Sequence, residues 1–216
     1  MIRNKIEIMS INNKLYGLVI CGGNSSRMGV DKSLLVYADK PQRYHVYLMM
    51  EGLCDRVFIS CNTEQLKTMD ESYPCIVDLP AYTGIGPIAA LLSAFAQFPG
   101  ADFLVAGCDY PFLKRDNLDE FMNSIDKSGI AASFYNNTGK LYEPMLAWYS
   151  YRSAEILKGM FDEKEYSLQH FLKKNNAGKF YPVDEKVIKS VDTLIEYYNV
   201  NETLMRHQQS ANGRIL

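Results

Sequence analysis

The amino-acid sequence predicts an α/β fold in which a mostly parallel β-sheet is covered by helices on both faces. Two observations lead to this prediction. Short apolar runs alternate with longer segments of helical pattern through the first half of the chain. The apolar runs are also continuous, without alternating polar positions, which is typical of strands buried on both faces.

Four apolar runs in the first half are the predicted strands: Leu15–Cys21, Val57–Cys61, Cys75–Val77 and Phe103–Gly107. The segments between them are predicted helices: Gln42–Leu53, a short one over Glu64–Met69, and one over residues 88–98 with Pro87 in its first turn. Ligands of parallel sheets bind at the carboxyl ends of the strands. The loops that follow Cys21, Cys61, Val77 and Gly107 are therefore expected to converge on one site.

The second half is less regular and is expected to extend the sheet and to shape an acceptor pocket. Its predicted helices are Asp116–Asp126, Ala154–Phe161 and Leu168–Lys174. Its predicted strands are Ile130–Tyr135 and Tyr142–Ala147, which flank an Asn-Asn-Thr-Gly turn, followed by Phe180–Val183 and Val187–Val191. With 216 residues and no repeat or proline-rich linker, residues 15–216 are predicted to form one domain after an N-terminal extension over residues 1–14.

Composition narrows the possible partners. The net charge is −2, so phosphate binding must come from locally placed groups, and nucleic acid is excluded as a main partner. The five cysteines include no C-x-x-C pair, which favours small buried thiols in a reducing compartment over a disulfide framework or a zinc site. Neither a signal peptide nor an apolar run of membrane-spanning length is found in the sequence, and a cytoplasmic location is predicted.

A glycine-rich loop, CGGNSSRMGVDK, runs from Cys21 to Lys32 directly after the first predicted strand. Gly22 and Gly23 allow the backbone to approach a ligand, and successive N–H groups there can cradle phosphate oxygens. Arg27 and Lys32 add two positive charges that suit phosphates. The loop matches neither the P-loop pattern nor the dinucleotide fingerprint. A surface turn with incidental charges is the alternative interpretation.

Polar residues follow the other strands as well. Asp109 ends a buried strand, where a carboxylate can hold Mg²⁺ together with substrate phosphates; capping of a turn is the alternative. Asp78 ends the third strand and precedes a Gly-Ile-Gly-Pro segment that leads into a helix N-terminus, a possible anion site. Asn62 could contact a base or ribose, or form a plain turn. Asn199 and Asn201 frame another possible polar site, or cap a helix.

Together these residues resemble the MobA family, the molybdenum cofactor guanylyltransferases. The resemblance rests on four stretches, which are ICGGNSSRMGVDK, VDLPAYTGIGPIAALLSAF, FLVAGCDYPFL and YNVNETLMRH. The first is similar to the family's L-A-G-G-x-S-x-R-M-G-x-D-K loop and the third to its C-D-x-P-F element. The last is similar to its N-x-N-T-P-x-D-L ending, although Glu202 and Thr203 replace the usual Thr-Pro.

The resemblance implies a Rossmann-like, three-layer α/β/α nucleotidyltransferase fold. It implies transfer of GMP from GTP to the terminal phosphate of the molybdenum-molybdopterin cofactor, with Mg²⁺ as cofactor and release of pyrophosphate. Carrier or acceptor enzymes of that cofactor are possible further partners. By position, Ile20, Cys21, Gly22, Gly23, Lys32, Asn62, Asp78 and Asp109 would bind the nucleotide, with Arg27, Lys32 and Asp109 as the catalytic residues and Asp109 as the metal ligand.

Two departures from the family pattern occur in the first stretch, where Ile20 and Cys21 replace Leu and Ala. In related cytidylyltransferases the first loop more often begins P-A-A-G, so the pair Gly22-Gly23 favours GTP. A nucleotidyltransferase that uses CTP or a sugar phosphate remains an alternative, and so does a non-catalytic nucleotide- or cofactor-binding protein.

Overall fold

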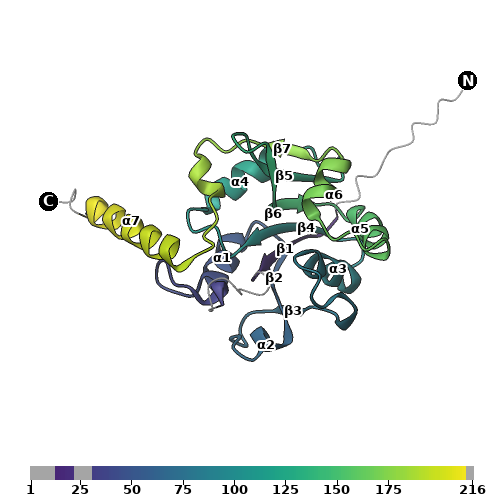
Figure 1. Cartoon of the computed structure of the whole chain (residues 1–216), viewed down its shortest axis with the longest axis horizontal. Coiled ribbons are helices and arrows are strands. Elements are labelled where there is room, and N and C mark those ends of the chain that lie inside the picture. The colour runs from purple at the N-terminus through teal and green to yellow at the C-terminus, as the bar shows by residue number, and fades with distance from the viewer. Residues whose placement is uncertain (1–12, 22–30, 213–216) are drawn as a thin grey trace, which may run out of the picture.

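The computed structural model describes residues 13–21 and 31–212, the last eight of these as backbone only. Within this part of the chain seven strands form one mixed sheet in the order β3-β2-β1-β4-β6-β5-β7 (Figure 1). The strands are β1 (Leu15–Ile20), β2 (Arg56–Cys61), β3 (Cys75–Val77), β4 (Asp102–Gly107), β5 (Ala131–Asn136), β6 (Leu141–Tyr149) and β7 (Gly178–Phe180). This arrangement confirms the predicted α/β class and the mostly parallel sheet.

The first-half strands are parallel, as their continuous apolar runs predict. β1 pairs with β2 and with β4, and β2 pairs with β3, all in the parallel sense. β6 is antiparallel to both β4 and β5, and β7 is parallel to β5. The first residues of β6 consequently reach the same edge of the sheet as the last residues of β1, β2 and β4.

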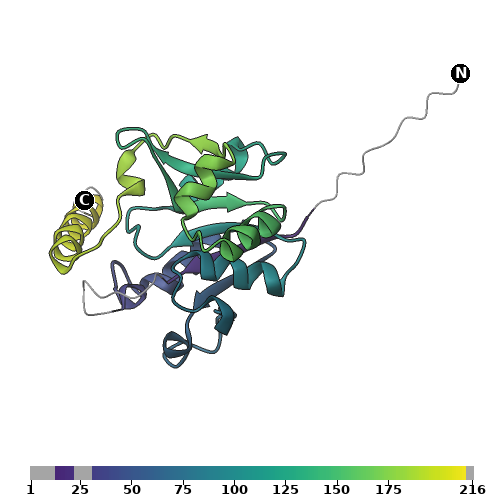
Figure 2. The same ribbon diagram turned by 45° about the vertical axis from the view of Figure 1, so that its right-hand side comes forward.

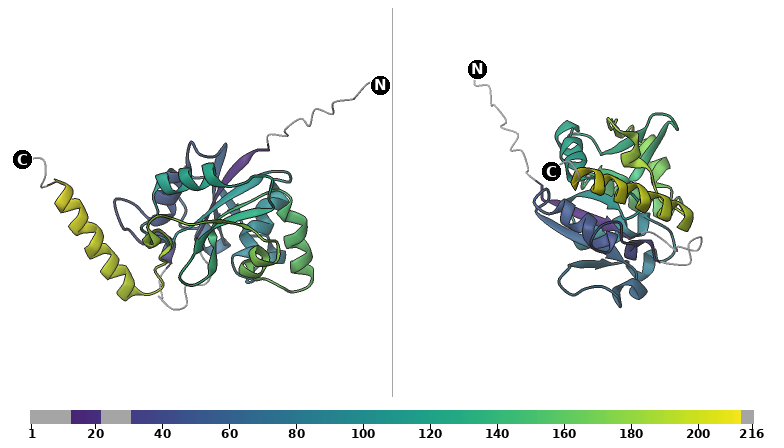
Figure 3. Two further views of the ribbon diagram at one scale, coloured as in Figure 1. Left: turned by 90° about the horizontal axis from the view of Figure 1, so that it is seen from above. Right: turned by 90° about the vertical axis from the view of Figure 1, so that its left-hand side faces the viewer.

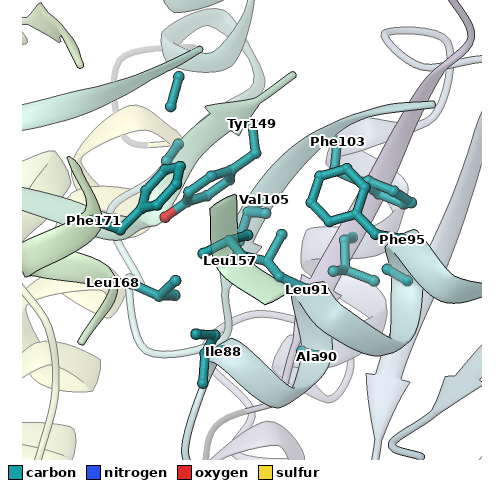
Figure 4. Packing of buried hydrophobic residues seen from close by; sticks show 14 of the residues in the cluster. Ile88, Ala90, Leu91, Phe95, Phe103, Val105, Tyr149, Leu157, Leu168 and Phe171 are labelled. Atoms are coloured by element: carbon teal, nitrogen blue, oxygen red, sulfur yellow. The ribbon is translucent and has the colours of Figure 1, made fainter. Parts of the chain in front are cut away.

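Helices cover both faces of the sheet (Figures 1 and 2). Helices α3 (Ile88–Gln97), α5 (Ser153–Asp162) and α6 (Leu168–Lys174) cover one face, and α1 (Gln42–Met50) and α4 (Arg115–Ser124) cover the other. The short helix α2 (Thr63–Leu66) follows β2. Two hydrophobic clusters, one on each face, hold the layers together, and the first of them is shown in Figure 4.

The hydrophobic cluster on the α3 face covers β4, the middle strand of the sheet. Phe103 on β4 is fully buried and packs edge to face on Phe95 of α3, with ring centroids 5.1 Å apart. Leu91 and Val105 belong to the same cluster, and Tyr149 packs on Phe171 farther along it, with ring centroids 5.8 Å apart (Figure 4). Fully burying one such side chain contributes about 1.5–3 kcal/mol, so this layer contributes much of the stability that fixes the strand ends.

The last helix, α7 (Leu194–Asn212), extends away from the sheet (Figure 3). Its first turns dock on the segment after β1: Tyr197 packs on Tyr37 with ring centroids 5.2 Å apart, and its hydroxyl donates to the carbonyl of Val36. Val191 and Val200 complete this small cluster. Residues near the end of the chain are thereby held beside Lys32. Among the described helices, none has the length and apolar character needed to cross a membrane.

Several predicted boundaries are correct within a few residues, and one prediction is wrong. The helix predicted over Gln42–Leu53 ends at Met50, and the strand predicted over Phe180–Val183 is found over Gly178–Phe180. The strand predicted over Val187–Val191 is instead part of a 3₁₀ turn over Glu185–Ile188. Val187 and Ile188 are both buried in the hydrophobic cluster on the α4 face, a packing that a tight helical turn also allows.

Candidate active site

A pocket of about 290 Å³ lies at the carboxyl ends of β1 and β2, beside the start of α3. Its lining residues come from the ends of these strands, from the loop after β3 and from α3. They are Ile20, Cys21, Ser60, Cys61, Asn62, Thr63, Gln65, Asp78, Thr83, Gly84, Gly86, Pro87, Ala89 and Ala90. Among the described residues, the loops that follow Cys61 and Val77 therefore meet here at the end of the first strand, as expected. The predicted residues Ile20, Cys21, Asn62 and Asp78 all line the pocket.

Asp78 is the acidic group of the pocket. Its backbone N–H donates to the carbonyl of Cys61 at 3.0 Å, which continues the parallel ladder between β3 and β2. The hydroxyl of Ser60 donates to Oδ1 of Asp78 at 3.4 Å. Burial raises the pKa of Asp78 above its usual value, although the Ser60 hydrogen bond opposes this. A half-buried carboxylate at a pocket wall is suited to accepting hydrogen bonds from the N–H or O–H groups of a nucleotide.

Asn62 lines the pocket and is also a helix cap. Its side-chain oxygen accepts from the N–H groups of Glu64 and Gln65, and the Gln65 side chain accepts from the N–H of Asn62. This capping box explains why α2 starts where it does. The Gln65 amide also donates to Asp31 at 3.1 Å, which connects α2 to the end of the glycine-rich loop.

The loop between β3 and α3 approaches the pocket with two glycines in the left-handed region. Gly84 has φ +81° and Gly86 has φ +80°, conformations that side-chain-bearing residues rarely adopt. Pro87 follows, and α3 begins at Ile88. The unpaired N–H groups of a helix N-terminus favour anions, so this wall of the pocket suits a polar or phosphate-bearing ligand.

Asp109 follows β4 and carries an unsatisfied buried oxygen. Its Oδ1 atom is buried and has no hydrogen-bond partner among the described residues. Burial raises the pKa of Asp109 to about 6; the charge of Lys32 lowers it and that of Asp192 raises it. Asp109 does not cap the next helix, because the residue before α4 is Lys114. An unpartnered buried carboxylate oxygen is costly, and such groups in native proteins call for an explanation such as a ligand.

Gly107 makes room for this carboxylate. A Cβ atom built on Gly107 would lie 2.6 Å from Oδ1 of Asp109, closer than real Cβ contacts occur. It would also lie 3.2 Å from the Cβ of Met145 on β6. The glycine at the end of β4 therefore lets the Asp109 side chain fold back over the strand end.

Lys32 reaches the same region from the other end of the glycine-rich loop. Its ammonium group lies 2.6 Å from Oδ1 of Asp192, a residue 160 positions later in the sequence. The backbone N–H of Val191 donates to the carbonyl of Asp109 at 2.9 Å, so Asp192 and Asp109 are held close together. Lys32 thus lies beside the carboxylates of Asp109 and Asp192. A lysine in this position can also bind a phosphate group that approaches the two carboxylates.

Glu143, on β6, lies on the other side of Asp109. Its Oε2 accepts from the hydroxyl of Tyr110 at 3.1 Å. Burial raises the pKa of Glu143 to about 7; the Tyr110 hydrogen bond lowers it and the charge of Asp109 raises it. Neither Glu143 nor Asp192 was predicted from the sequence. Both belong to the second half, where they carry no local motif and reach the site only through tertiary contacts.

Not all predicted residues are at the site. Gly22, Gly23 and Arg27 lie outside the described residues. Helix capping is excluded for Asn199 and Asn201, because both lie inside helix α7, which begins at Leu194; the polar site at these two residues stays a prediction. The residue that the C-terminal part of the chain supplies to the site is Asp192.

The donor set fits a divalent cation that is shared with phosphates. Asp109 offers a buried oxygen without a protein partner, and Asp192 is a second carboxylate close by. Mg²⁺ typically takes one or two carboxylates and completes its shell with water and substrate phosphates. Within the described part of the chain no three Asp, Glu, His or Cys side chains converge on one point as a metal cage. Two carboxylates would leave the rest of a Mg²⁺ shell to water and substrate phosphates.

Apart from Asp192, the residues of this site lie in a part of the chain that matches a known family model. Residues 17–179 match the model of the MobA-like NTP transferase domain. The chain belongs to the MobA-like NTP transferase family. It is thus a nucleotidyltransferase, and the family resemblance predicted from the sequence is confirmed.

Individual relatives agree with this assignment. Over 194 residues the chain is 28% identical to a molybdenum cofactor biosynthesis bifunctional protein of Synechocystis, of which it spans 51%. It is 24% identical over 202 residues to a probable molybdenum cofactor guanylyltransferase of Bacillus mycoides, covering 93% of this chain and 99% of that protein. Among solved structures, the molybdopterin-guanine dinucleotide biosynthesis protein A of Archaeoglobus fulgidus superposes with a TM-score of 0.70 at 21% identity, covering 88% and 99% of the two chains. At that identity the superposition supports the fold alone.

Proposed function

We propose that this protein transfers GMP from GTP to the terminal phosphate of a molybdenum-bearing pterin cofactor and releases pyrophosphate. The observation that carries the proposal is the placement of Lys32 and Asp109 at the ends of the glycine-rich loop and of β4, next to a pocket lined by Asp78 and Asn62. The names of the relatives support GTP and the pterin cofactor as the substrates.

In this mechanism the acceptor phosphate attacks the α-phosphorus of GTP in line. One P–O bond forms to the acceptor oxygen, the bond to the leaving pyrophosphate breaks, and that oxygen keeps the electron pair. The acceptor phosphate is largely ionised near neutral pH, so a general base is not required. The protein contributes mainly by positioning the reactants and stabilising charge.

Lys32 and Arg27 would stabilise the negative charge that develops on the transferred and leaving phosphates. In the structure Lys32 is paired with Asp192, so binding of the triphosphate would exchange one anionic partner for another. Asp109 and Asp192 would hold Mg²⁺, which when bound would neutralise phosphate charge and orient the phosphate oxygens. The loop residues Gly22 and Gly23, together with Ile20, Cys21, Asn62 and Asp78, would hold the nucleotide.

The test is pyrophosphate release from GTP, CTP, ATP and UTP, each with Mg²⁺ and with or without the molybdenum-loaded pterin cofactor. Release that requires both GTP and the cofactor is expected. Equal or faster release with CTP would move the assignment to a cytidylyltransferase. Binding of GTP without pyrophosphate release, whatever the acceptor, would indicate a nucleotide-binding protein instead of an enzyme of this reaction.

A further inference from the structure

The sheet order divides the candidate site into two sides. The pocket proposed for the nucleotide is built by β1, β2, the loop after β3 and α3, all on one side of β4. On the other side of β4 lies β6, which runs antiparallel to it. Ala106 faces Leu146 across this pair, and Glu143, three residues earlier on β6, is close enough to Asp109 to feel its charge. Glu143 is thus an acidic group on the side away from the nucleotide pocket.

Folding alone does not account for a glutamate at this position. The side chain is half-buried, and no lysine or arginine within the described ranges forms an ion pair with it. The groups facing it are the Tyr110 hydroxyl and the carboxylate of Asp109, and the negative charge of Asp109 makes ionisation of Glu143 less favourable. A carboxylate buried without a counter-ion destabilises a fold.

The backbone of Glu143 is nevertheless firmly fixed. The fully buried hydroxyl of Ser133 donates to the carbonyl of Glu143 at 2.9 Å and accepts from its N–H at 3.0 Å. The pairing register between β5 and β6 shifts between Ser133 and Tyr135, so β5 is irregular beside this contact. Such irregularities commonly redirect a side chain next to an active site.

The carboxyl of Glu143 has room for a further hydrogen-bond partner, and within the described residues it forms no cluster of three metal-binding side chains. The Tyr110 hydrogen bond occupies one acceptor position on Oε2, and a carboxyl group offers about four. The remaining positions can accept hydrogen bonds from a molecule that lies against β6.

We infer that Glu143 is an acceptor-contacting, specificity-determining residue. Its carboxyl accepts a hydrogen bond from an N–H or O–H group of the acceptor, which lies on the β6 side of Asp109 while the nucleotide lies on the β1 side. The acceptor class that fits is a phosphate monoester that carries polar hydrogen-bond donors near its phosphate and no second anionic group there. The inference rests on the proposed function. It assigns the β6 side of the site, which the nucleotide does not occupy, to binding of the acceptor.

The test compares wild-type protein with Glu143→Gln in steady-state pyrophosphate release, with GTP and the molybdenum-loaded pterin cofactor varied separately. The amide keeps the shape of the side chain but loses the charged acceptor. We expect KM for the cofactor to rise about five- to tenfold, because a hydrogen bond to a neutral amide oxygen is weaker than one to a carboxylate, and KM for GTP to change less than about twofold. Glu185→Gln is the matched control, because Glu185 is an exposed glutamate whose carboxylate contacts Thr138 away from the pocket.

An unchanged KM for the cofactor would overturn the inference, and so would an equal rise in both KM values, since that indicates a structural or nucleotide-side role. If Glu143→Gln does not fold, as judged by thermal melting, Glu143→Asp replaces it and is held to the same criterion. If the wild-type protein releases no pyrophosphate, the proposed function fails, and equilibrium titration of the pterin cofactor onto wild type and variant decides the role of Glu143. Weaker binding to the variant supports that role; equal binding, or none to the wild type, overturns it.

Discussion

The most specific consequence of the site geometry concerns Gly107, which has no catalytic atoms of its own. In Gly107→Ala the new methyl group would lie 2.6 Å from Oδ1 of Asp109. Real contacts of this kind stay above 3.0 Å, and ordinary contact begins at 3.4 Å. The carboxylate must therefore move by about 0.4 Å at least, and by about 0.8 Å to reach ordinary contact.

A displacement of this size is expected to harm function more than stability. A misplacement of about 1 Å at a reacting centre can cost about a hundredfold in rate, so kcat/KM should fall about ten- to hundredfold. The Mg²⁺ concentration needed for half-maximal rate should rise, because Asp109 is the proposed ligand. Overpacking at one buried position costs about 1–3 kcal/mol, and for a chain of this size each kcal/mol lowers Tm by about 2–4 °C.

The assay is pyrophosphate release titrated with MgCl₂, together with calorimetric melting of the same samples. Gly159→Ala is the matched control, because a Cβ there meets no atom within 4 Å and Gly159 is exposed in helix α5. That variant should keep wild-type kinetics and gain up to about 1 kcal/mol in stability. Wild-type turnover and an unchanged Mg²⁺ titration in Gly107→Ala would refute the reasoning that links Gly107 to the position of Asp109.

Three further predictions follow from the same site. Lys32→Ala should slow turnover about a hundredfold or more at saturating substrates, and intact turnover would remove Lys32 from the mechanism. Asp192→Asn should raise the Mg²⁺ concentration needed for half-maximal rate, and Asn199→Ala should leave the kinetics unchanged. The reverse result would assign the function of this part of the chain to Asn199 and Asn201 instead of Asp192. Burial raises the pKa of Asp78 in the folded protein above its unfolded value near 3.8. The folded state therefore favours the protonated side chain. The resulting contribution to stability is fully present below pH 3.8 and is lost as the pH rises through the folded-state pKa. Ligand-free Asp78→Asn should accordingly melt above the wild type at pH 7, and the difference should shrink below pH 4; equal melting temperatures at pH 7 would contradict the assigned burial cost.

The sequence predicted the first half of the fold well because its signals there are local. The runs at β1 and β4 are apolar throughout, since both faces of a central parallel strand are covered, and this pattern is visible without any tertiary knowledge. The positions of Asp78 and Asp109 at strand ends could be predicted for the same reason, because each lies within two residues of the end of such a run.

The second half was harder to predict because its contributions depend on contacts between distant segments. Asp192 is paired with a lysine 160 residues earlier, and nothing in its neighbours indicates that contact. The segment Val187–Val191 has the composition of a strand, but its first two residues lie in a 3₁₀ turn that packs both side chains into the hydrophobic cluster on the α4 face. Glu143 reaches the site because β6 is antiparallel to β4, a direction that the sequence of β6 does not specify.

The central claim is that a guanylyl group is transferred to an acceptor phosphate, and α-labelled GTP tests it most directly. The wild-type protein is incubated with Mg²⁺, [α-³²P]GTP and the molybdenum-loaded pterin cofactor, and the products are separated by chromatography. We predict that the label appears in a pterin-containing product in equal amount to the pyrophosphate released, and that omission of the cofactor abolishes both. Label that remains in GTP, or that is found only in free GMP or GDP, would contradict the account.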